Sequence, residues 1–150
     1  MHLRYGNMWS AFADADFFII TTNSFVKANG AAVLGRGIAR QARDRFPAFD
    51  LRLGLCISNS VGHLGRYGLI VGSKLGAFQV KYHFKDQADP ELIAYSASKL
   101  VEYAAARPGQ QIHLNYPGIG NGGLPRPVVA PLLDDLPDNV HVWQFGRSNP

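Results

Sequence analysis

Residues 16–39 read Asp16-Phe-Phe-Ile-Ile-Thr-Thr-Asn-Ser-Phe-Val-Lys-Ala-Asn-Gly-Ala-Ala-Val-Leu-Gly-Arg-Gly-Ile-Ala39, and this stretch decides the fold class. Its first part, 16–22, is apolar on both faces and rich in strand-forming residues, which predicts a central β-strand. After a long loop, apolar residues recur at helical spacing over 34–46, with arginines on the opposite face, which predicts a helix. A buried strand, a glycine-containing loop and a helix in this order are typical of an α/β protein.

The alternation of strands and helices continues to the end of the chain. Asp89-Pro90-Glu91 predicts a helix start, because it supplies an N-cap residue, a proline at the first helical position and an acid in the first turn. A shorter helix, kinked by its prolines, is expected over 125–133. We therefore expect one domain over residues 1–150, with helices on both faces of a mostly parallel sheet. Further strands are expected at 1–5, 68–73, 77–82, 111–116 and 139–145.

A second glycine-rich segment, Pro117-Gly-Ile-Gly-Asn-Gly-Gly-Leu124, follows the strand expected at 111–116. A simple turn needs one or two glycines, whereas four in six residues cost considerable chain entropy. Glycine lets the backbone approach a ligand closely and aim its N–H groups at an anion. In such sheets ligands bind beyond the carboxyl ends of the strands, where both glycine-rich segments begin. The pattern predicts one cleft for a nucleotide-type ligand.

The first glycine segment, Gly35-Arg-Gly-Ile-Ala39, matches neither of the common nucleotide fingerprints. The dinucleotide fingerprint needs its first glycine directly after a strand, and here a long loop intervenes. A P-loop needs Gly-Lys-Ser/Thr, which is absent. What the segment does predict is a helix N-terminus flanked by glycines, which is an anion site through backbone N–H groups and the helix dipole.

Composition limits the partners that the chain can have. Its 150 residues include 15 Lys and Arg against 11 Asp and Glu, a net charge of +4 that suits an anionic ligand and is compatible with a nucleic-acid partner. No apolar run is long enough to span a membrane, so we expect no membrane partner and a cytoplasmic location. Cys56 is the only cysteine, which leaves no internal disulfide and no thiolate zinc site, and we expect it to be at least half buried. The histidines lack metal-ligand spacing, and we expect no metal and no cofactor.

Five segments, taken in order, carry a family resemblance. They are Thr21-Thr22-Asn23, Asn29-Gly30, Val33-Leu-Gly-Arg-Gly-Ile-Ala39, Lys81-Tyr-His-Phe-Lys-Asp86 and Gly118-Ile-Gly-Asn-Gly-Gly-Leu124. Together they resemble the macrodomain family, in the branch that includes terminal ADP-ribose glycohydrolases and the antitoxins that remove ADP-ribose from DNA. The resemblance implies a three-layer α/β/α sandwich around a mixed, mostly parallel sheet, with ADP-ribose as the ligand.

The resemblance also implies where the parts of ADP-ribose bind. Asn7 and Met8 would lie near the adenine, although family members commonly have aspartate where this chain has Asn7. Asn23, Asn29 and Gly30 would face the distal ribose, and the two glycine-rich loops would hold the phosphates. The implied ligand-binding residues are Asn7, Met8, Thr22, Asn23, Asn29, Gly30, Val33, Leu34, Gly35, Arg36, Gly37, Ile38, Pro117, Gly118, Ile119, Gly120, Asn121, Gly122, Gly123 and Leu124.

Lys81 is the catalytic residue that the resemblance implies, because antitoxin-like members carry a lysine at this place that acts on the distal ribose. An ammonium can stabilise an oxygen leaving group, or attack an anomeric carbon when its pKa is depressed. If the segment is extended, Lys81, His83 and Lys85 share one face, and the alternative to a catalytic Lys81 is an electrostatic collar for phosphate or nucleic acid. Related enzymes often have an acid and an aromatic residue after the second loop, where this chain has Pro125-Arg126. The sequence therefore names no general base.

Three functions remain open at the level of the sequence. The first is an ADP-ribose-binding macrodomain that hydrolyses ADP-ribose from a modified macromolecule, either DNA or another nucleic acid, or protein. The second is a reader that binds ADP-ribose without turnover, which the missing acid favours. The third is a nucleic-acid-binding module that uses the helix face of Arg36, Arg40 and Arg43 to contact phosphates.

Overall fold

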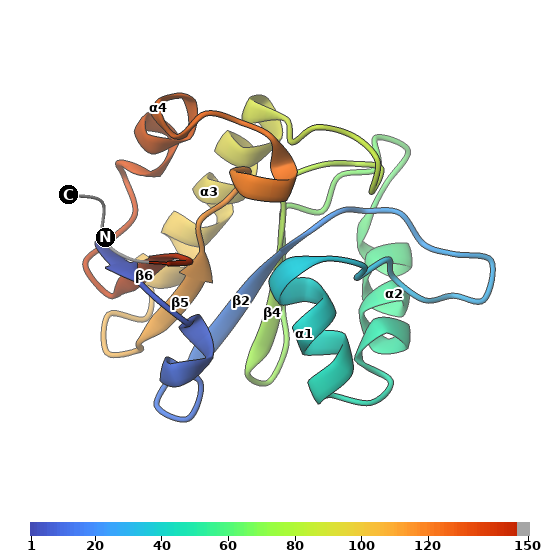
Figure 1. Ribbon diagram of the computed structural model, residues 1–150, viewed down its shortest axis with the longest axis horizontal. Coiled ribbons are helices and arrows are strands. Elements are labelled where there is room, and N and C mark those ends of the chain that lie inside the picture. Colours follow the sequence, from blue (N-terminus) through green and yellow to red (C-terminus); the bar gives the residue numbers. More distant parts are fainter. Residues whose placement is uncertain (147–150) are drawn as a thin grey trace.

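The computed structural model describes residues 1–146, which form a central sheet with helices on both sides (Figure 1). Its six strands are His2–Tyr5 (β1), Phe17–Thr22 (β2), Leu69–Val71 (β3), Leu75–Gln79 (β4), Ile112–Asn115 (β5) and Val140–Gln144 (β6). Their order in the sheet is β1-β6-β5-β2-β4-β3, and neighbours are parallel except β3 and β4. The expected α/β fold with a mixed, mostly parallel sheet is confirmed.

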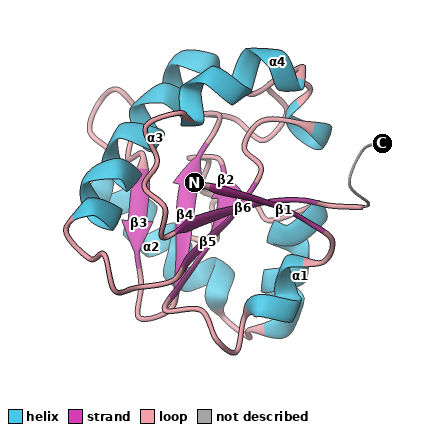
Figure 2. Ribbon diagram, turned by 90° about the vertical axis from the view of Figure 1, so that its left-hand side faces the viewer, coloured by secondary structure: helices cyan, strands magenta, loops and turns pink. Residues whose placement is uncertain are grey.

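The helices form the two outer layers (Figure 2). They are Gly37–Arg45 (α1), Phe49–Ser60 (α2), Pro90–Ala105 (α3) and Arg126–Val129 (α4), with 3₁₀ turns at Met8–Ala11, Gly120–Gly122 and Ala130–Leu133. Side chains of β2 alternate between the two cores: Phe17 and Ile19 pack on the α3 side, and Phe18 and Ile20 on the α1 and α2 side. Because β2 is buried on both faces, it reads as a continuous apolar run in the sequence.

Helix α3 follows its sequence signals closely. The Asp89 carboxylate accepts a hydrogen bond from the Glu91 N–H at 2.9 Å and caps the helix, and Pro90 occupies the first helical position. Four apolar residues at helical spacing form a stripe that is buried against the sheet. The residues of that stripe are Ile93, Ala97, Leu100 and Ala104.

Helix α2 is the element that the sequence pattern did not predict. Its buried residues Phe49, Leu53 and Ile57 lie four apart, but apolar side chains on the outer face hide this period. Cys56 belongs to that outer face and is exposed, so the expectation that it is half buried or more is wrong. Gly54 interrupts the helix pattern for a packing reason, because a Cβ there would lie 1.9 Å from the Gly30 carbonyl oxygen. Within residues 1–146, no helix has both the length and the apolar character to cross a membrane.

Candidate functional site

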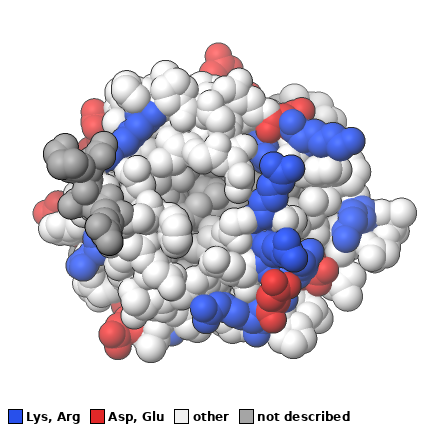
Figure 3. Space-filling model, viewed as in Figure 1, with Lys and Arg blue, Asp and Glu red and all other residues white. Residues whose placement is uncertain are grey.

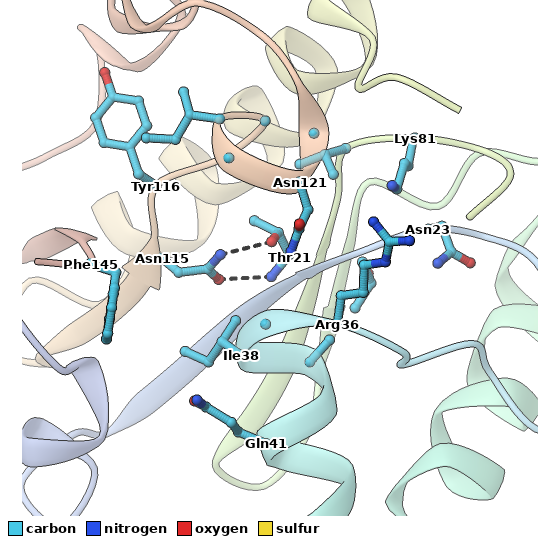
Figure 4. Close-up of a pocket in the computed structure, with 18 of the residues that line it drawn as sticks. Thr21, Asn23, Arg36, Ile38, Gln41, Lys81, Asn115, Tyr116, Asn121 and Phe145 are labelled. Carbon is cyan, nitrogen blue, oxygen red and sulfur yellow. Dashed lines mark hydrogen bonds between the residues drawn. The ribbon is translucent and has the colours of Figure 1, made fainter. Parts of the chain in front are cut away.

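A cleft opens where β2 and β5 separate. The two strands pair as far as Ile19 and Leu114, and the helices that follow them pack on opposite faces of the sheet. Such a switch point leaves a crevice at the carboxyl ends of the strands. The Asn115 side chain spans the gap: its Oδ1 accepts from the Thr21 N–H at 2.9 Å, and its Nδ2 donates to Thr21 Oγ1 at 2.8 Å (Figure 4). This pair forms the floor of the cleft.

The two glycine-rich loops form facing walls of the cleft, which encloses about 1080 Å³. Gly37 belongs to the first loop and Asn121 to the second, and a Cβ built on Gly37 would lie 3.4 Å from Asn121 Nδ2. The predicted convergence of the two loops on one cavity is therefore present in the structure. Its volume is at the upper end of the range for small-molecule sites, about 300–1,000 Å³, and suits a ligand of nucleotide size.

The first wall is the N-terminus of α1. The N-cap residue Arg36 makes no side-chain capping bond, and Gly37, Ile38 and Ala39 line the cleft. The first N–H groups of a helix have no partner within the helix, so here they are free of capping and available to an anion. The N-terminus of α1 that the sequence predicted therefore faces the cleft without a side-chain cap, which is the arrangement that an anion site requires.

The second wall is a tight glycine loop anchored at both ends. Gly118 and Gly120 have left-handed backbone, with φ of +78° and +64°. The Leu124 N–H donates to the Gly118 carbonyl at 2.9 Å, and the Ala88 N–H donates to the Gly122 carbonyl at 2.8 Å. The second bond ties the loop to the segment just before α3.

Lys81 lies at one end of the cleft, half buried, and follows Val80 after the end of β4 at Gln79. Its Nζ donates to the Phe84 carbonyl oxygen at 3.0 Å, and the Arg36 side chain extends toward it from the first loop (Figure 4). Partial burial lowers the pKa of Lys81, the nearby Arg36 guanidinium lowers it further, and Asp86 opposes both effects. Among the described residues that line the cleft, Asp86 supplies the one carboxylate.

The segment after Lys81 is a turn, so the expectation that Lys81, His83 and Lys85 share one face of an extended segment is wrong. Strand β4 ends at Gln79, and the Asp86 N–H donates to the His83 carbonyl at 3.0 Å. Lys81 and Lys85 line the cleft, whereas His83 is packed among aromatic rings beside it. The hydrogen bonds that close the turn replace the strand pairing that alternation would require.

An aromatic cluster forms the rim next to Lys81. The His83 ring stacks on Phe84 at 4.3 Å between centroids, and Phe25 meets both rings edge-on. Phe25 and Phe84 are each 36% exposed, and Phe84 and Lys85 line the cleft. Figure 3 shows Lys and Arg side chains gathered along one side of the hollow. The rim at this end is therefore both aromatic and basic.

The other end of the cleft is lined by Asn7, Met8 and the carboxyl end of β6. Asn7 Oδ1 accepts a hydrogen bond from the Trp9 N–H at 3.1 Å and caps the first 3₁₀ turn. An uncharged asparagine therefore suffices as the capping residue at this position. Phe145, 86% exposed, offers a free aromatic ring at this end. Arg126 donates to Oε1 of Gln144, the residue before Phe145, at 2.8 Å.

Trp143 lines the same end of the cleft, and a hydrogen bond to a buried histidine holds its ring in place. Its indole N–H donates to His113 Nδ1 at 2.9 Å, and the His113 ring stacks on His141. Burial, helped by the neighbouring His141 and Arg4, lowers the pKa of His113 to about 4. The imidazole is therefore neutral at pH 7 and remains an acceptor for the indole. His113 and His141 are thus packed and hydrogen-bonded within neighbouring strands.

The structure separates the predicted ligand-binding residues into two groups. Those that line the cleft, together with Lys81, are Asn7, Met8, Thr22, Asn23, Val33, Gly35, Arg36, Gly37, Ile38, Gly118, Ile119, Gly120, Asn121 and Gly122. Those that do not line it are Asn29, Gly30, Leu34, Pro117, Gly123 and Leu124.

Each residue of the second group has another place in the fold. Asn29 and Gly30 lie in a projecting hairpin closed by a Val26–Ala32 bridge, and the Gly30 carbonyl packs on Gly54 of α2. Leu34 is buried in the core beneath α1. The Gly123 carbonyl accepts from the Gln87 side chain, the Leu124 N–H donates to the Gly118 carbonyl, and Pro117 is buried. The structure therefore does not support the expectation that these six residues contact the ligand, because none of them lines the cleft.

Several residues that line the cleft carried no signal in the sequence. Asn115, Trp143 and Gln144 lie near the ends of β5 and β6, and Tyr116 follows β5, so these residues reach the site only after folding. Gln41 approaches the site from the body of α1. The polar Asn115 at the end of β5, shortly before the glycine-rich loop, is the one signal that could have been used. Among the described residues there is no group of three or more His, Cys, Asp or Glu arranged to hold a metal ion.

Comparisons with known proteins agree with this architecture. The sequence matches no protein-family model and no curated protein. The macrodomain of Thermus aquaticus DarG superposes with a TM-score of 0.72 at 25% identity, over 97% of this chain and 98% of that one. The macrodomain of Mycobacterium tuberculosis DarG gives 0.70 at 21% identity, over 97% and 98%. Thermosipho africanus DarTG, in complex with ADP-ribose, gives 0.73 at 17% identity, over all of this chain and 43% of that one.

The mixed six-stranded sheet, the helical layers and the cleft at the switch point are those of the macrodomain fold. The solved structures that share this fold with the chain include DarG macrodomains, in agreement with the resemblance carried by the five sequence segments.

Proposed function

We propose that this chain binds ADP-ribose in the cleft and hydrolyses it from a modified macromolecule. One observation carries the proposal: both glycine-rich loops, the N-terminus of α1 and Lys81 face a single cavity. The diphosphate lies between the two loops and accepts hydrogen bonds from their backbone N–H groups. The ADP-ribose in the complex of Thermosipho africanus DarTG, a protein of the same fold, supports this choice of ligand.

The two ends of the cleft differ in a way that orients the ligand. The adenine binds at the end with Met8 and Phe145, where an apolar side chain and a free aromatic ring suit a base. The distal ribose binds at the end with Asn23 and Lys81, where the polar groups gather. This orientation brings the anomeric carbon of the distal ribose, the carbon attached to the macromolecule, toward Lys81.

Hydrolysis breaks the bond between that anomeric carbon and the macromolecule and adds water to the carbon. The Lys81 ammonium stabilises negative charge on the departing atom, or supplies its proton. Asp86 is the carboxylate of the cleft and accepts the proton that the attacking water releases. Related enzymes often carry this acid directly after the second glycine-rich loop, where this chain has Pro125-Arg126. In the proposed mechanism Asp86 performs the role of that acid.

The rim beside Lys81 favours a nucleic acid as the macromolecule that carries the ADP-ribose. Bases stack on exposed aromatic rings, and lysines hold the backbone that joins them. Phe25 and Phe84 offer such rings, and Lys85 lies next to them in the cleft wall. A protein substrate has no general need for this combination.

Release of ADP-ribose from modified DNA and from modified protein tests the proposal. We expect wild type to release it and Lys81→Ala to lose most of the rate, whereas Lys99→Ala, which removes a lysine of α3 outside the cleft, keeps it. If wild type and Lys81→Ala are equally inert, the hydrolase assignment fails. Calorimetry with free ADP-ribose then identifies a reader, which binds without turnover, and no heat at millimolar ligand removes both functions.

The nucleic-acid-binding module is the remaining alternative, and the geometry favours it less. Arg36 faces the cleft, while Arg40 and Arg43 lie near Asp44, at 4.0 Å and 3.3 Å between charged atoms. The arginine face is thus partly neutralised. Such a module would bind unmodified nucleic acid with an affinity that falls steeply with salt, and we expect little binding of that kind.

A further inference from the structure

A buried polar network lies behind the Lys81 end of the cleft. Its hydrogen bonds join the segment that carries Asn23 to the segment that carries Lys81. Tyr67 and Gln79 are its centre, and both side chains are almost completely buried. We propose that Tyr67 and Gln79 are positioning residues that set the place of Asn23 relative to Lys81. The inference rests on the proposed function, because those two residues are where the distal ribose is proposed to bind.

Tyr67 holds the end of β2. Its hydroxyl donates to the Asn23 carbonyl oxygen at 3.0 Å and also meets Thr22 Oγ1. Burial raises the pKa of Tyr67, so the phenol keeps its proton and stays a donor. The backbone at Asn23 is therefore held by a side chain from a loop that is distant in sequence.

Gln79 uses both ends of its amide to hold the end of β4. Its Oε1 accepts from the N–H groups of Tyr67 at 2.8 Å and Gly68 at 3.1 Å. Its Nε2 donates to the carbonyls of Gly65 at 3.0 Å and Lys81 at 3.4 Å. With two acceptor and two donor positions filled, the side chain has one orientation. The loop that carries Tyr67 and the backbone of Lys81 are thus joined through one amide.

The network adds to the few backbone contacts that remain at the ends of the strands. The paired residues of β2 and β4 end at Thr22 and Gln79. Beyond them, two backbone hydrogen bonds join the segments, from the Val80 N–H to the Thr22 carbonyl at 3.0 Å and from the Ser24 N–H to the Tyr82 carbonyl at 3.1 Å. Ser96 of α3 adds a hydrogen bond of 2.7 Å to the Gln79 carbonyl from the opposite layer. Neither Tyr67 nor Gln79 lines the cleft, so they act on the ligand only through Asn23 and Lys81.

Tyr67→Phe tests the inference because it removes one oxygen and preserves the ring. We expect kcat for ADP-ribose release to fall about ten- to a hundredfold, since small misplacement of reacting groups has effects of that size. The dissociation constant for free ADP-ribose stays within about twofold, because the loops that hold the diphosphate are unchanged. The matched control is Tyr103→Phe, which removes a hydroxyl that donates to Gln110 far from the cleft. A kcat for Tyr67→Phe within about twofold of that control overturns the inference.

Two additions keep the test decisive. If Tyr67→Phe does not fold, Ser96→Ala loosens the Gln79 carbonyl instead and is expected to lower kcat in the same direction. If wild type itself releases no ADP-ribose, the hydrolase proposal fails, and the pKa of Lys81 measured by NMR tests the positioning alone. We expect that pKa to rise toward its ordinary value in Tyr67→Phe, as the side chain becomes better solvated. An unchanged Lys81 pKa contradicts the network's role.

Discussion

Replacing Gly118 by alanine is expected to lower the free energy of unfolding by about 2–5 kcal/mol. The backbone at Gly118 is left-handed, with φ of +78°, and an alanine in that conformation costs about 1–2 kcal/mol. The new Cβ would also lie 2.6 Å from Ile93 Cδ1 and 3.1 Å from Leu124 Cδ1. Overpacking of this kind costs about 1–3 kcal/mol, because neighbours in a dense core must shift.

Urea denaturation of the two proteins measures this difference. Gly109→Ala is the control, because its backbone is not left-handed and a Cβ there meets nothing within 4 Å. We expect the control to change stability by no more than about 0.5 kcal/mol. If Gly118→Ala unfolds at the same urea concentration as the control, the account of why the second loop needs glycine at this position is refuted.

Three further changes test other parts of the site. Asp86→Asn removes both the proposed proton acceptor and the charge that raises the pKa of Lys81, so kcat for ADP-ribose release should fall, and the pKa of Lys81 measured by NMR should move lower. A move of that pKa to a higher value contradicts the assigned pairing. The fold favours the neutral form of His113, because its pKa falls from 6.5 in the unfolded chain to about 4 in the folded protein. The free energy of unfolding therefore keeps the full contribution of His113 above pH 6.5 and loses it as the pH falls toward 4. Unfolding measured at pH 7 and pH 4.5 should show a smaller acid loss in His113→Gln than in wild type. Arg126→Ala frees the Gln144 side chain, and calorimetry should show about two- to tenfold weaker ADP-ribose binding, whereas unchanged affinity would place Arg126 outside the function.

The parts of the fold that the sequence predicted are those with strong local signals. The β2 run is apolar on both faces because both helical layers cover it, and the start of α3 is marked by its own cap at Asp89. Helix α2 lacked such signals, since Leu51 and Leu55 are exposed and break the apolar period. Its Gly54 is required because the Gly30 carbonyl packs against it and leaves no room for a Cβ. That contact joins residues distant in sequence, and no local pattern records it.

The same distinction applies to the site. The two glycine-rich loops were recognisable because their composition is unusual within a few residues. Asn115, which ends β5, and Phe145, which follows β6, were missed because they reach the cleft only through the strand order of the sheet. Asn29 and Gly30 were assigned to the ribose by resemblance, but the hairpin between Val26 and Ala32 carries them away from the cleft.

The central claim is that one cleft holds ADP-ribose with its distal ribose at Lys81. A crystal structure of the complex with ADP-ribose tests this claim most directly. The account predicts the diphosphate between the loops of Gly37 and Asn121, the adenine beside Phe145, and the anomeric carbon of the distal ribose within reach of Lys81 Nζ. A ligand bound in the reverse direction, or with its distal ribose turned away from Lys81, would contradict the account.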